Sequence, residues 1–89
     1  MSKRLTQSQL DAVLQKHEFF RAGRSGGARA ILQFYDLAGM SFRGKDLSQV
    51  DLTGSILIEA DFENAILDNA VLFGCDMRFG NFKKTSFVK

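Results

Sequence analysis

The residues of this chain that could do chemistry are one histidine, one cysteine and a series of aspartates. His17 has no second histidine and no cysteine at ligand spacing, so packing or hydrogen bonding explains it better than metal binding. Cys75 occupies the same position in a five-residue spacing as the small residues Ala70 and Gly80, so it behaves as a small apolar side chain rather than a nucleophile. Five aspartates share one phase of a five-residue spacing, which marks them as part of a repeat: Asp36, Asp46, Asp51, Asp61 and Asp76.

The glycine pair Gly26-Gly27 is not a phosphate-binding loop, because the Lys-Ser/Thr that completes such a motif is missing. The repeated aspartates are instead suited to hydrogen bonding with backbone groups at chain corners. We therefore predict no enzyme, with no catalytic, cofactor-binding or metal-binding residue. We predict no cofactor.

An amphipathic helix is predicted near the N-terminus, over about residues 7–21. Thr6 and Gln9 have the spacing of a capping box, and glycines from Gly23 onward stop the pattern. One apolar stripe follows the spacing of three and four residues, along Leu10, Val13, Leu14, His17 and Phe20. A helix this short is marginal in water, so its stripe must be buried against another element.

From residue 30 onward the sequence repeats every five residues, giving twelve pentads over residues 30–89. The third position of every pentad holds a large apolar side chain. A helix would spread such a period around its surface, and a strand would alternate it between two faces. These side chains are buried together only if the chain turns a corner once per pentad and repeats stack on their neighbours. The predicted inward core is Leu32, Leu37, Phe42, Leu47, Leu52, Leu57, Phe62, Leu67, Leu72, Met77, Phe82 and Phe87.

The pentads ADFEN at 60–64 and VDLTG at 50–54 resemble the A-(D/N)-L-x-x motif of the pentapeptide-repeat proteins. The resemblance covers residues 30–89 and extends upstream through His17 and residues 26–29, since some members carry a helix and a Gly-Gly-basic segment there. It implies a mainly β fold, a right-handed quadrilateral β-helix of about three coils with an N-terminal capping α-helix. The predicted parts are residues 1–29, the helix and glycine-rich cap, and residues 30–89, the β-helix.

In that family four pentads make one square coil, so residues twenty apart would stack at about 4.7–4.9 Å. One inward column would then be entirely aromatic, along Phe42, Phe62 and Phe82. The small first position of the motif is instead occupied by four larger residues early in the repeat, which predicts an irregular first coil and early second coil: Tyr35, Met40, Lys45 and Val50.

The two ends of such a solenoid are expected to differ. The N-terminal helix should cover the first coil, whereas the repeat stops on a complete pentad at Lys89 and should leave an open backbone edge. We predict self-association there, as a dimer or end-to-end stack, since some family members dimerise; the alternative is a piece of a longer repeat array. The candidate self-association residues are Phe73, Met77, Phe79, Phe82, Phe87 and Val88.

A second apolar surface is predicted at positions that should face solvent. An exposed patch of this kind marks either a partner site or the face on which the N-terminal helix docks, and both readings stay open. The patch consists of Ile56, Ile58, Val71 and Phe73.

The net charge of +2 is unevenly distributed, with +4 in residues 1–29, −5 in residues 30–74 and +3 in residues 75–89. The favoured function is a non-enzymatic module that binds itself or another protein. The acidic middle leaves open a second function, DNA mimicry directed at a topoisomerase such as gyrase, which the family resemblance implies. A third is weak nucleic-acid binding by the basic end, although the small net charge argues against it: Arg78, Lys83, Lys84 and Lys89.

The sequence also predicts a cytoplasmic protein that does not interact with a membrane. No stretch approaches the ~20 apolar residues of a membrane helix, and the first residues do not form a signal peptide. A single cysteine fits a reducing compartment.

Overall fold

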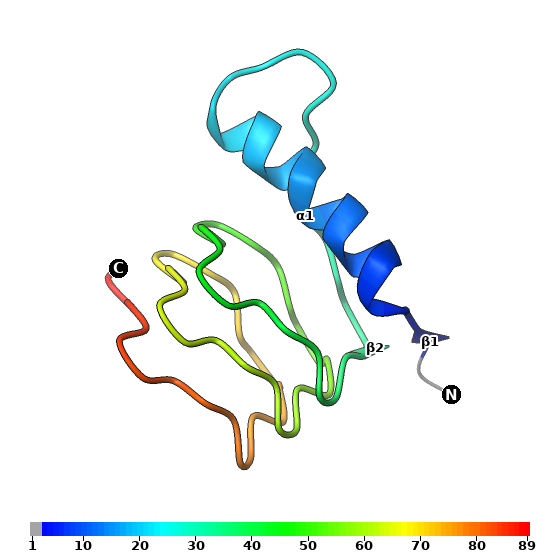
Figure 1. The fold of residues 1–89 in the computed structure, drawn as a ribbon, viewed down its shortest axis with the longest axis vertical. Coiled ribbons are helices and arrows are strands. Elements are labelled where there is room, and N and C mark those ends of the chain that lie inside the picture. Colours follow the sequence, from blue (N-terminus) through cyan, green and yellow to red (C-terminus); the bar gives the residue numbers. More distant parts are fainter. Residues whose placement is uncertain (1–2) are drawn as a thin grey trace.

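The computed structural model describes residues 3–89, in which one helix lies across the end of a stack of coils (Figure 1). The chain begins with strand β1 (Lys3–Arg4), continues into helix α1 (Gln7–Arg21) and enters the coils, whose first strand is β2 (Tyr35–Asp36). Strands β1 and β2 pair in parallel, with Lys3 opposite Tyr35 and Arg4 opposite Asp36. Strand β1 was not predicted from the sequence.

Helix α1 has the bounds that were predicted from the capping box at its start and from the glycines after its end. The Thr6 hydroxyl accepts a hydrogen bond from the Gln9 N–H at 3.1 Å, and the Gln9 side chain accepts one from the Thr6 N–H at 2.9 Å. This reciprocal pair satisfies two backbone donors at the helix start. The helix ends at Arg21, shortly before Gly23 adopts a φ of 69°. Of its apolar stripe, Leu10, Leu14 and His17 are buried, so this face packs on the coils.

The corners of the coils recur at the fifth position of each pentad. Every fifth-position residue from Phe34 to Lys84 has a positive φ, between 56° and 71°. From Leu37 onward, the third-position carbonyl accepts a hydrogen bond from the N–H of the next pentad's first residue, as between Leu37 and Met40 at 3.1 Å. This is the geometry of a turn with left-handed backbone at its third residue. It explains why glycine and asparagine are frequent at the fifth position.

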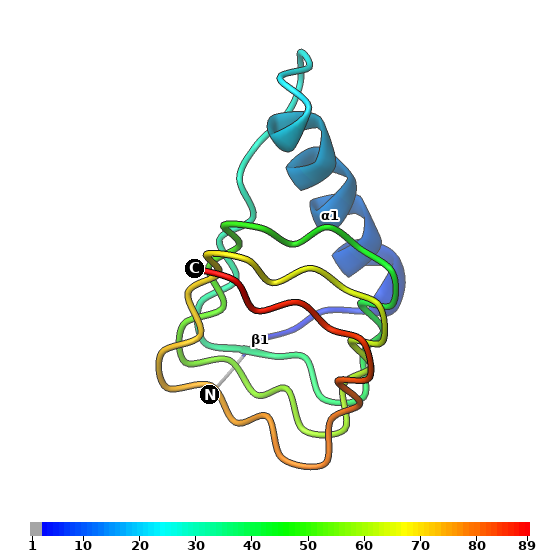
Figure 2. The same ribbon diagram turned by 90° about the vertical axis from the view of Figure 1, so that its left-hand side faces the viewer.

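Residues twenty apart form parallel bridges on all four sides of the stack, for example Ile31 with Asp51 and Asp51 with Val71. Residues 70–89 therefore stack on residues 50–69, which stack on residues 30–49 (Figure 2). We call residues 30–49, 50–69 and 70–89 the first, second and third levels of the stack. The chain is a β-helix solenoid, while its handedness and number of coils stay predictions. We name its four sides face A (30–34, 50–54, 70–74), face B (35–39, 55–59, 75–79), face C (40–44, 60–64, 80–84) and face D (45–49, 65–69, 85–89).

The centre of the solenoid holds the aromatic column that the twenty-residue period predicted. The Phe42 and Phe62 rings stack with centroids 4.5 Å apart and planes 3° apart, and Phe62 stacks on Phe82 at 5.2 Å and 10°. The third-position residues of the first two levels are all buried: Leu32, Leu37, Phe42, Leu47, Leu52, Leu57, Phe62 and Leu67.

The last level of the predicted inward core is less enclosed. Leu72, Met77 and Phe82 are only partly buried against the core. The prediction is wrong for Phe87, which is 48% exposed and whose ring lies 5.9 Å from that of Phe82 at a tilt of 45°. The physical reason is that residues 70–89 have a neighbouring level on one side only, so side chains here lack the packing partners that enclose Phe42 and Phe62.

The irregularity expected from four large first-position residues is largely absent. Met40 and Val50 are buried, and their corner turns are regular. Lys45 keeps its turn and its side chain is exposed. Only Tyr35 departs: its N–H donates to the Ser55 hydroxyl at 3.1 Å, and that hydroxyl donates to the Leu32 carbonyl. Tyr35 and Met40 belong to residues 30–49, which are covered by residues 3–21 rather than by another coil, whereas Val50 stacks on the small residue Ala30.

Candidate interaction surfaces

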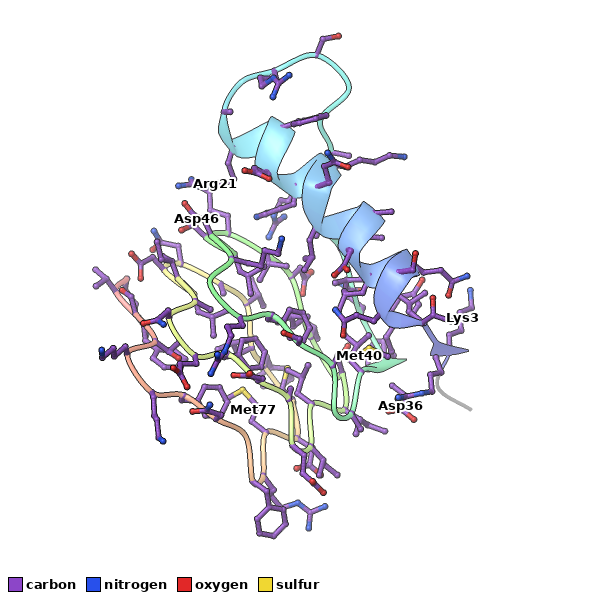
Figure 3. The ribbon with its side chains drawn as sticks, viewed as in Figure 1. Lys3, Arg21, Asp36, Met40, Asp46 and Met77 are labelled. Carbon is purple, nitrogen blue, oxygen red and sulfur yellow. The ribbon has the colours of Figure 1, made fainter. Side chains whose placement is uncertain are left out.

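The N-terminal end of the solenoid is closed by residues 3–21, which provide hydrogen-bond partners for the backbone of faces B, C and D. On face B the partner is strand β1, and the Arg4 guanidinium also donates to the Ala38 carbonyl at 3.1 Å. On face C it is Gln7, and on face D it is His17. Two ion pairs add to these contacts. Arg4, just before the helix, contacts Asp36 at 3.1 Å, and Arg21, the last helical residue, contacts Asp46 at 3.3 Å (Figure 3).

The Gln7 side chain makes the two hydrogen bonds to Ser41 that a backbone peptide group of a neighbouring strand would make. Its amide nitrogen donates to the Ser41 carbonyl at 2.9 Å, and its amide oxygen accepts from the Ser41 N–H at 2.8 Å. A primary amide offers the same donor and acceptor as a backbone peptide. This role of Gln7 was not predicted from the sequence, because its partner Ser41 lies 34 positions along the chain.

His17 connects the helix to both ends of the first level, at Ala30 on face A and at Ser48 on face D. Its Nδ1 accepts from the Ala30 N–H at 2.9 Å, so Nε2 carries the ring proton and donates to the Ser48 carbonyl, also at 2.9 Å. Burial lowers the pKa of His17, against an opposing effect of the Ser48 carbonyl. This is the packing and hydrogen-bonding role that the sequence favoured.

The helix does not dock on the predicted apolar patch. All the hydrogen bonds and ion pairs that join α1 to the coils, within residues 3–89, end on residues 30–48. That reading of Ile56, Ile58, Val71 and Phe73 is therefore wrong, because the buried stripe of α1 faces the end of the stack rather than its side. Phe73 is 82% exposed, Val71 is exposed, and the two isoleucines are half-buried.

An exposed aromatic that the sequence analysis missed lies at the corner between faces A and B. Phe34 is 62% exposed, and its ring lies over the corner of the next level, in space that a side chain at Gly54 would need. Glycine recurs there at Gly74, one level further. The contact could have been predicted from the twenty-residue spacing of Phe34, Gly54 and Gly74, in which two glycines leave room beside the aromatic ring. The period of five alone does not show this alignment.

The C-terminal end of the solenoid has no comparable cover in the structure. A hollow of about 310 Å³ opens between faces A and D, lined by Leu72, Phe73, Phe87 and Val88 among others. Val88 is 63% exposed. Of the candidate self-association residues, Phe73, Phe87 and Val88 meet at this hollow, whereas Phe79, 81% exposed, stands at the corner between faces B and C. Met77 and Phe82 are partly buried and pack against the core.

The acidic middle of the sequence is mostly paired with arginine. Arg43 contacts Asp61 at 3.2 Å and Glu63 at 2.8 Å, and Arg78 contacts Asp76 at 2.8 Å. Hydrogen bonds from Asn81 and the charge of Arg43 lower the pKa of Glu63, and the Arg78 guanidinium lowers the pKa of Asp76. The pairing of Asp36 with Arg4 and of Asp46 with Arg21 reduces the −5 charge of residues 30–74 to −3, because Arg43 is already counted in that sum.

The repeated second-position residues act on the backbone, as predicted. Asp46, Asp51 and Asp61 each accept a hydrogen bond from the N–H two residues later, at 3.0 Å. Cys75 is half-buried, its sulfur donates to the Leu52 carbonyl, and burial raises the pKa of the thiol. Neither kind of residue has the setting of a nucleophile or a general base.

Residues 3–89 contain no group of three or more histidine, cysteine or carboxylate side chains placed to hold a metal ion. The same part of the chain has no helix of sufficient length and hydropathy to cross a membrane.

Square coils with a twenty-residue stacking period, left-handed corners and an inward column of large apolar residues define a solenoid of pentad repeats. A family model for pentapeptide repeats matches residues 30–69 and 57–88, with eight copies of the repeat. The chain belongs to the pentapeptide-repeat family. A comparison with curated proteins finds no match. Membership indicates a non-enzymatic protein-interaction module.

Proposed function

We propose that this protein binds a second copy of itself through the C-terminal end of its solenoid. The observation that carries the proposal is the contrast between the two ends. Residues 3–21 close one end with backbone and side-chain hydrogen bonds, while the other exposes Phe73, Phe87 and Val88 around one hollow. An apolar surface beside an unpaired strand edge is a site for association.

The proposal includes the finer features of the fold that family membership supports. The solenoid is right-handed, with three coils of four pentads, and residues 70–89 form the third coil. The cytoplasm stays the predicted location. DNA mimicry toward gyrase and nucleic-acid binding by Arg78, Lys83, Lys84 and Lys89 stay the alternatives. The pairing of Asp36 with Arg4 and of Asp46 with Arg21 reduces the anionic surface that DNA mimicry needs.

Sedimentation equilibrium of the 89-residue chain tests self-association directly. The monomer mass is 9.9 kDa, and we expect a species of twice that mass at micromolar concentration. Val88→Lys places a charge at the proposed interface and should weaken the dimer at least about tenfold, which corresponds to about 1.4 kcal/mol. Ile31→Lys is the matched control, because Ile31 is 50% exposed on the first level, at the opposite end.

Two results would contradict the proposal. One is a monomer at high micromolar concentration. The other is a dimer that Ile31→Lys dissociates and Val88→Lys does not, since that dimer would use the other end or a side. Competition with DNA for gyrase and loss of DNA affinity with salt test the two alternatives in the same preparation.

A further inference from the structure

A second hollow opens on the side of the molecule, where helix α1 meets the corner between faces D and A. Its volume is about 400 Å³, and its lining comes from the helix, from the segment that enters the first level and from two successive corners. The lining residues are Phe20, Arg29, Gln49 and Asn69, and all four are exposed. The last three are each twenty positions apart, so this corner presents polar side chains on both the first and the second level.

The segment that carries Arg29 is held on helix α1 on both sides of this residue. The loop of residues 22–29 turns back from the end of α1 to the first level (Figure 1). The Ala28 N–H donates to the Lys16 carbonyl at 3.0 Å, and the Ala30 N–H donates to His17 Nδ1 at 2.9 Å. The backbone of Arg29 is therefore fixed before any ligand arrives.

A close approach of the loop to the helix adds to this rigidity. Gly27 lies against the backbone of Phe20, so that a Cβ at position 27 would overlap the Phe20 nitrogen. Only glycine allows this approach, because every other residue would push the segment away from the helix. A group that is presented from a fixed backbone loses less conformational entropy on binding.

The guanidinium of Arg29 is held at one nitrogen and free at the other two. Its Nε donates to the Gln49 carbonyl at 2.6 Å, and its terminal nitrogens form no hydrogen bond within residues 3–89. No carboxylate in the same part of the chain pairs with Arg29. The arginines that do form ion pairs there are Arg4, Arg21, Arg43 and Arg78.

The two corner amides and one aromatic ring lie beside this guanidinium. Gln49 and Asn69 have φ angles of 69° and 59°, and neither side-chain amide has a hydrogen-bond partner among the described residues. A primary amide donates from its nitrogen, and a guanidinium donates two parallel hydrogen bonds to one carboxylate. The Phe20 ring, 40% exposed, adds an apolar wall. The hollow therefore combines a charged fork, two amides and an aromatic surface.

This combination suits a carboxylate that is attached to an apolar group, as in a protein segment where Asp or Glu stands beside a large apolar residue. A nucleic-acid duplex fits less well, because it carries one charge about every 1.7 Å along its axis and needs a row of cations. The neighbours of the hollow along the chain are instead acidic: Glu18 lies on the same helix as Phe20, and Asp68 precedes Asn69. These carboxylates would repel a continuous phosphate backbone, whereas a single carboxylate bound at Arg29 need not approach them.

We propose that the hollow lined by Phe20, Arg29, Gln49 and Asn69 binds an acidic segment of a partner protein. The terminal nitrogens of Arg29 hold one carboxylate of the segment, and the corner amides donate to the same group. The Phe20 ring contacts the apolar side chain next to it. The site lies within a single chain, between α1 and the first two levels, so this partner is additional to the second copy of the proposed function and does not depend on self-association.

Selection from a phage library of random linear peptides tests the site directly. We expect the enriched peptides to contain Asp or Glu next to an aromatic or large aliphatic residue. The most enriched peptide, labelled with fluorescein, then gives a dissociation constant by anisotropy for each variant. Arg29→Gln should weaken binding at least about tenfold, and Arg29→Lys should weaken it too, because lysine keeps the charge without the fork. Lys83→Gln, which removes an exposed charge on face C, should leave it unchanged.

Asn69→Gly separates the loss of binding from a loss of folding. Its φ of 59° suits glycine, so removal of the side chain should not destabilise the corner turn. Asn64→Gly is the matched control, because Asn64 has a φ of 61° on the same level, at the corner between faces C and D. We expect Asn69→Gly to weaken peptide binding about threefold or more, through the lost hydrogen bond, and Asn64→Gly to have no effect.

Three results would overturn the proposal: no peptide enriched over a parallel selection against Arg29→Gln, enriched peptides without a carboxylate, or binding that survives both Arg29→Gln and Asn69→Gly. Duplex DNA is the second probe. DNA binding that Arg29→Gln abolishes, without any enriched acidic peptide, would assign the hollow to nucleic acid instead. A monomer by sedimentation would overturn the proposed function and leave this site intact.

Discussion

Mild acid should loosen the N-terminal cap through His17, the single histidine of the chain. The neutral ring accepts from the Ala30 N–H and donates to the Ser48 carbonyl. A second proton, on Nδ1, would turn that acceptor into a donor facing the Ala30 N–H. The charged groups around the ring partly offset one another, because Arg21 and Arg29 lower the pKa of His17 and Asp46 raises it.

The sign and size of the effect follow from the direction of the shift. The folded-state pKa of His17 lies below the ordinary value of 6.5. Below about pH 6.5 the unfolded chain binds a proton that the folded protein excludes, so the free energy of unfolding should fall by up to about 1.4 kcal/mol per pH unit. The carboxyls of Asp46 and Asp51 have lowered pKa values, so their contribution is lost only as pH falls through the range below about 4.

Urea unfolding at about pH 7.5, 6.5 and 5.5 measures this dependence. His17→Gln is the matched variant, because its amide can accept and donate without titrating, so its unfolding free energy should be nearly constant over that range. His17→Ala should cost about 2–4 kcal/mol at pH 7.5, since a buried N–H loses its acceptor and a cavity remains. A wild-type stability that is flat from pH 7.5 to 5.5, or a slope that persists in His17→Gln, would refute the reasoning.

Three further predictions concern the rest of the fold, each measured by urea unfolding. Gln7→Ala removes both side-chain hydrogen bonds to the first level and should cost about 1–2 kcal/mol, whereas Gln15→Ala, on the exposed side of α1, should cost less than about 0.5 kcal/mol. Phe62→Ala should cost about 3–5 kcal/mol and Phe82→Ala distinctly less, because only the first is enclosed by a ring on each side; equal costs would contradict the stacking. Gly74→Ala should cost about 1–2 kcal/mol because its φ is 70°, although no atom blocks a methyl group there beyond ordinary contact.

The repeat, its core and the helix could be predicted from the sequence because each depends on a local or periodic signal. The five-residue phase of large apolar residues placed Phe42 under Phe62, and the twenty-residue stacking was testable from that column alone. The capping pair Thr6 and Gln9 determined where the helix starts, since both partners lie within one turn.

The contacts that close the first level could not be predicted, because they join residues far apart in the chain without any repeat. Arg4 reaches Asp36 and Gln7 reaches Ser41 across more than thirty positions. Nothing in the spacing of these residues distinguishes them from an exposed arginine and an exposed glutamine. For Phe87 the repeat led to a wrong prediction. Its third position in the pentad predicted burial, but a side chain there is buried only when a further level packs against it.

The cap also determines how the helix and the coils are aligned with each other. In a solenoid each repeat contacts only its neighbours, so the end level depends on whatever covers it. Strand β1 continues the parallel ladder for two residues, Thr6 then starts the helix, and Gln7 is its first residue. Ten residues further, His17 lies on the buried side of the same helix and bonds the fourth face. A shift of the helix by one residue would break the Gln7 and His17 contacts together, so the polar contacts specify the register while Leu10 and Leu14 supply the apolar packing.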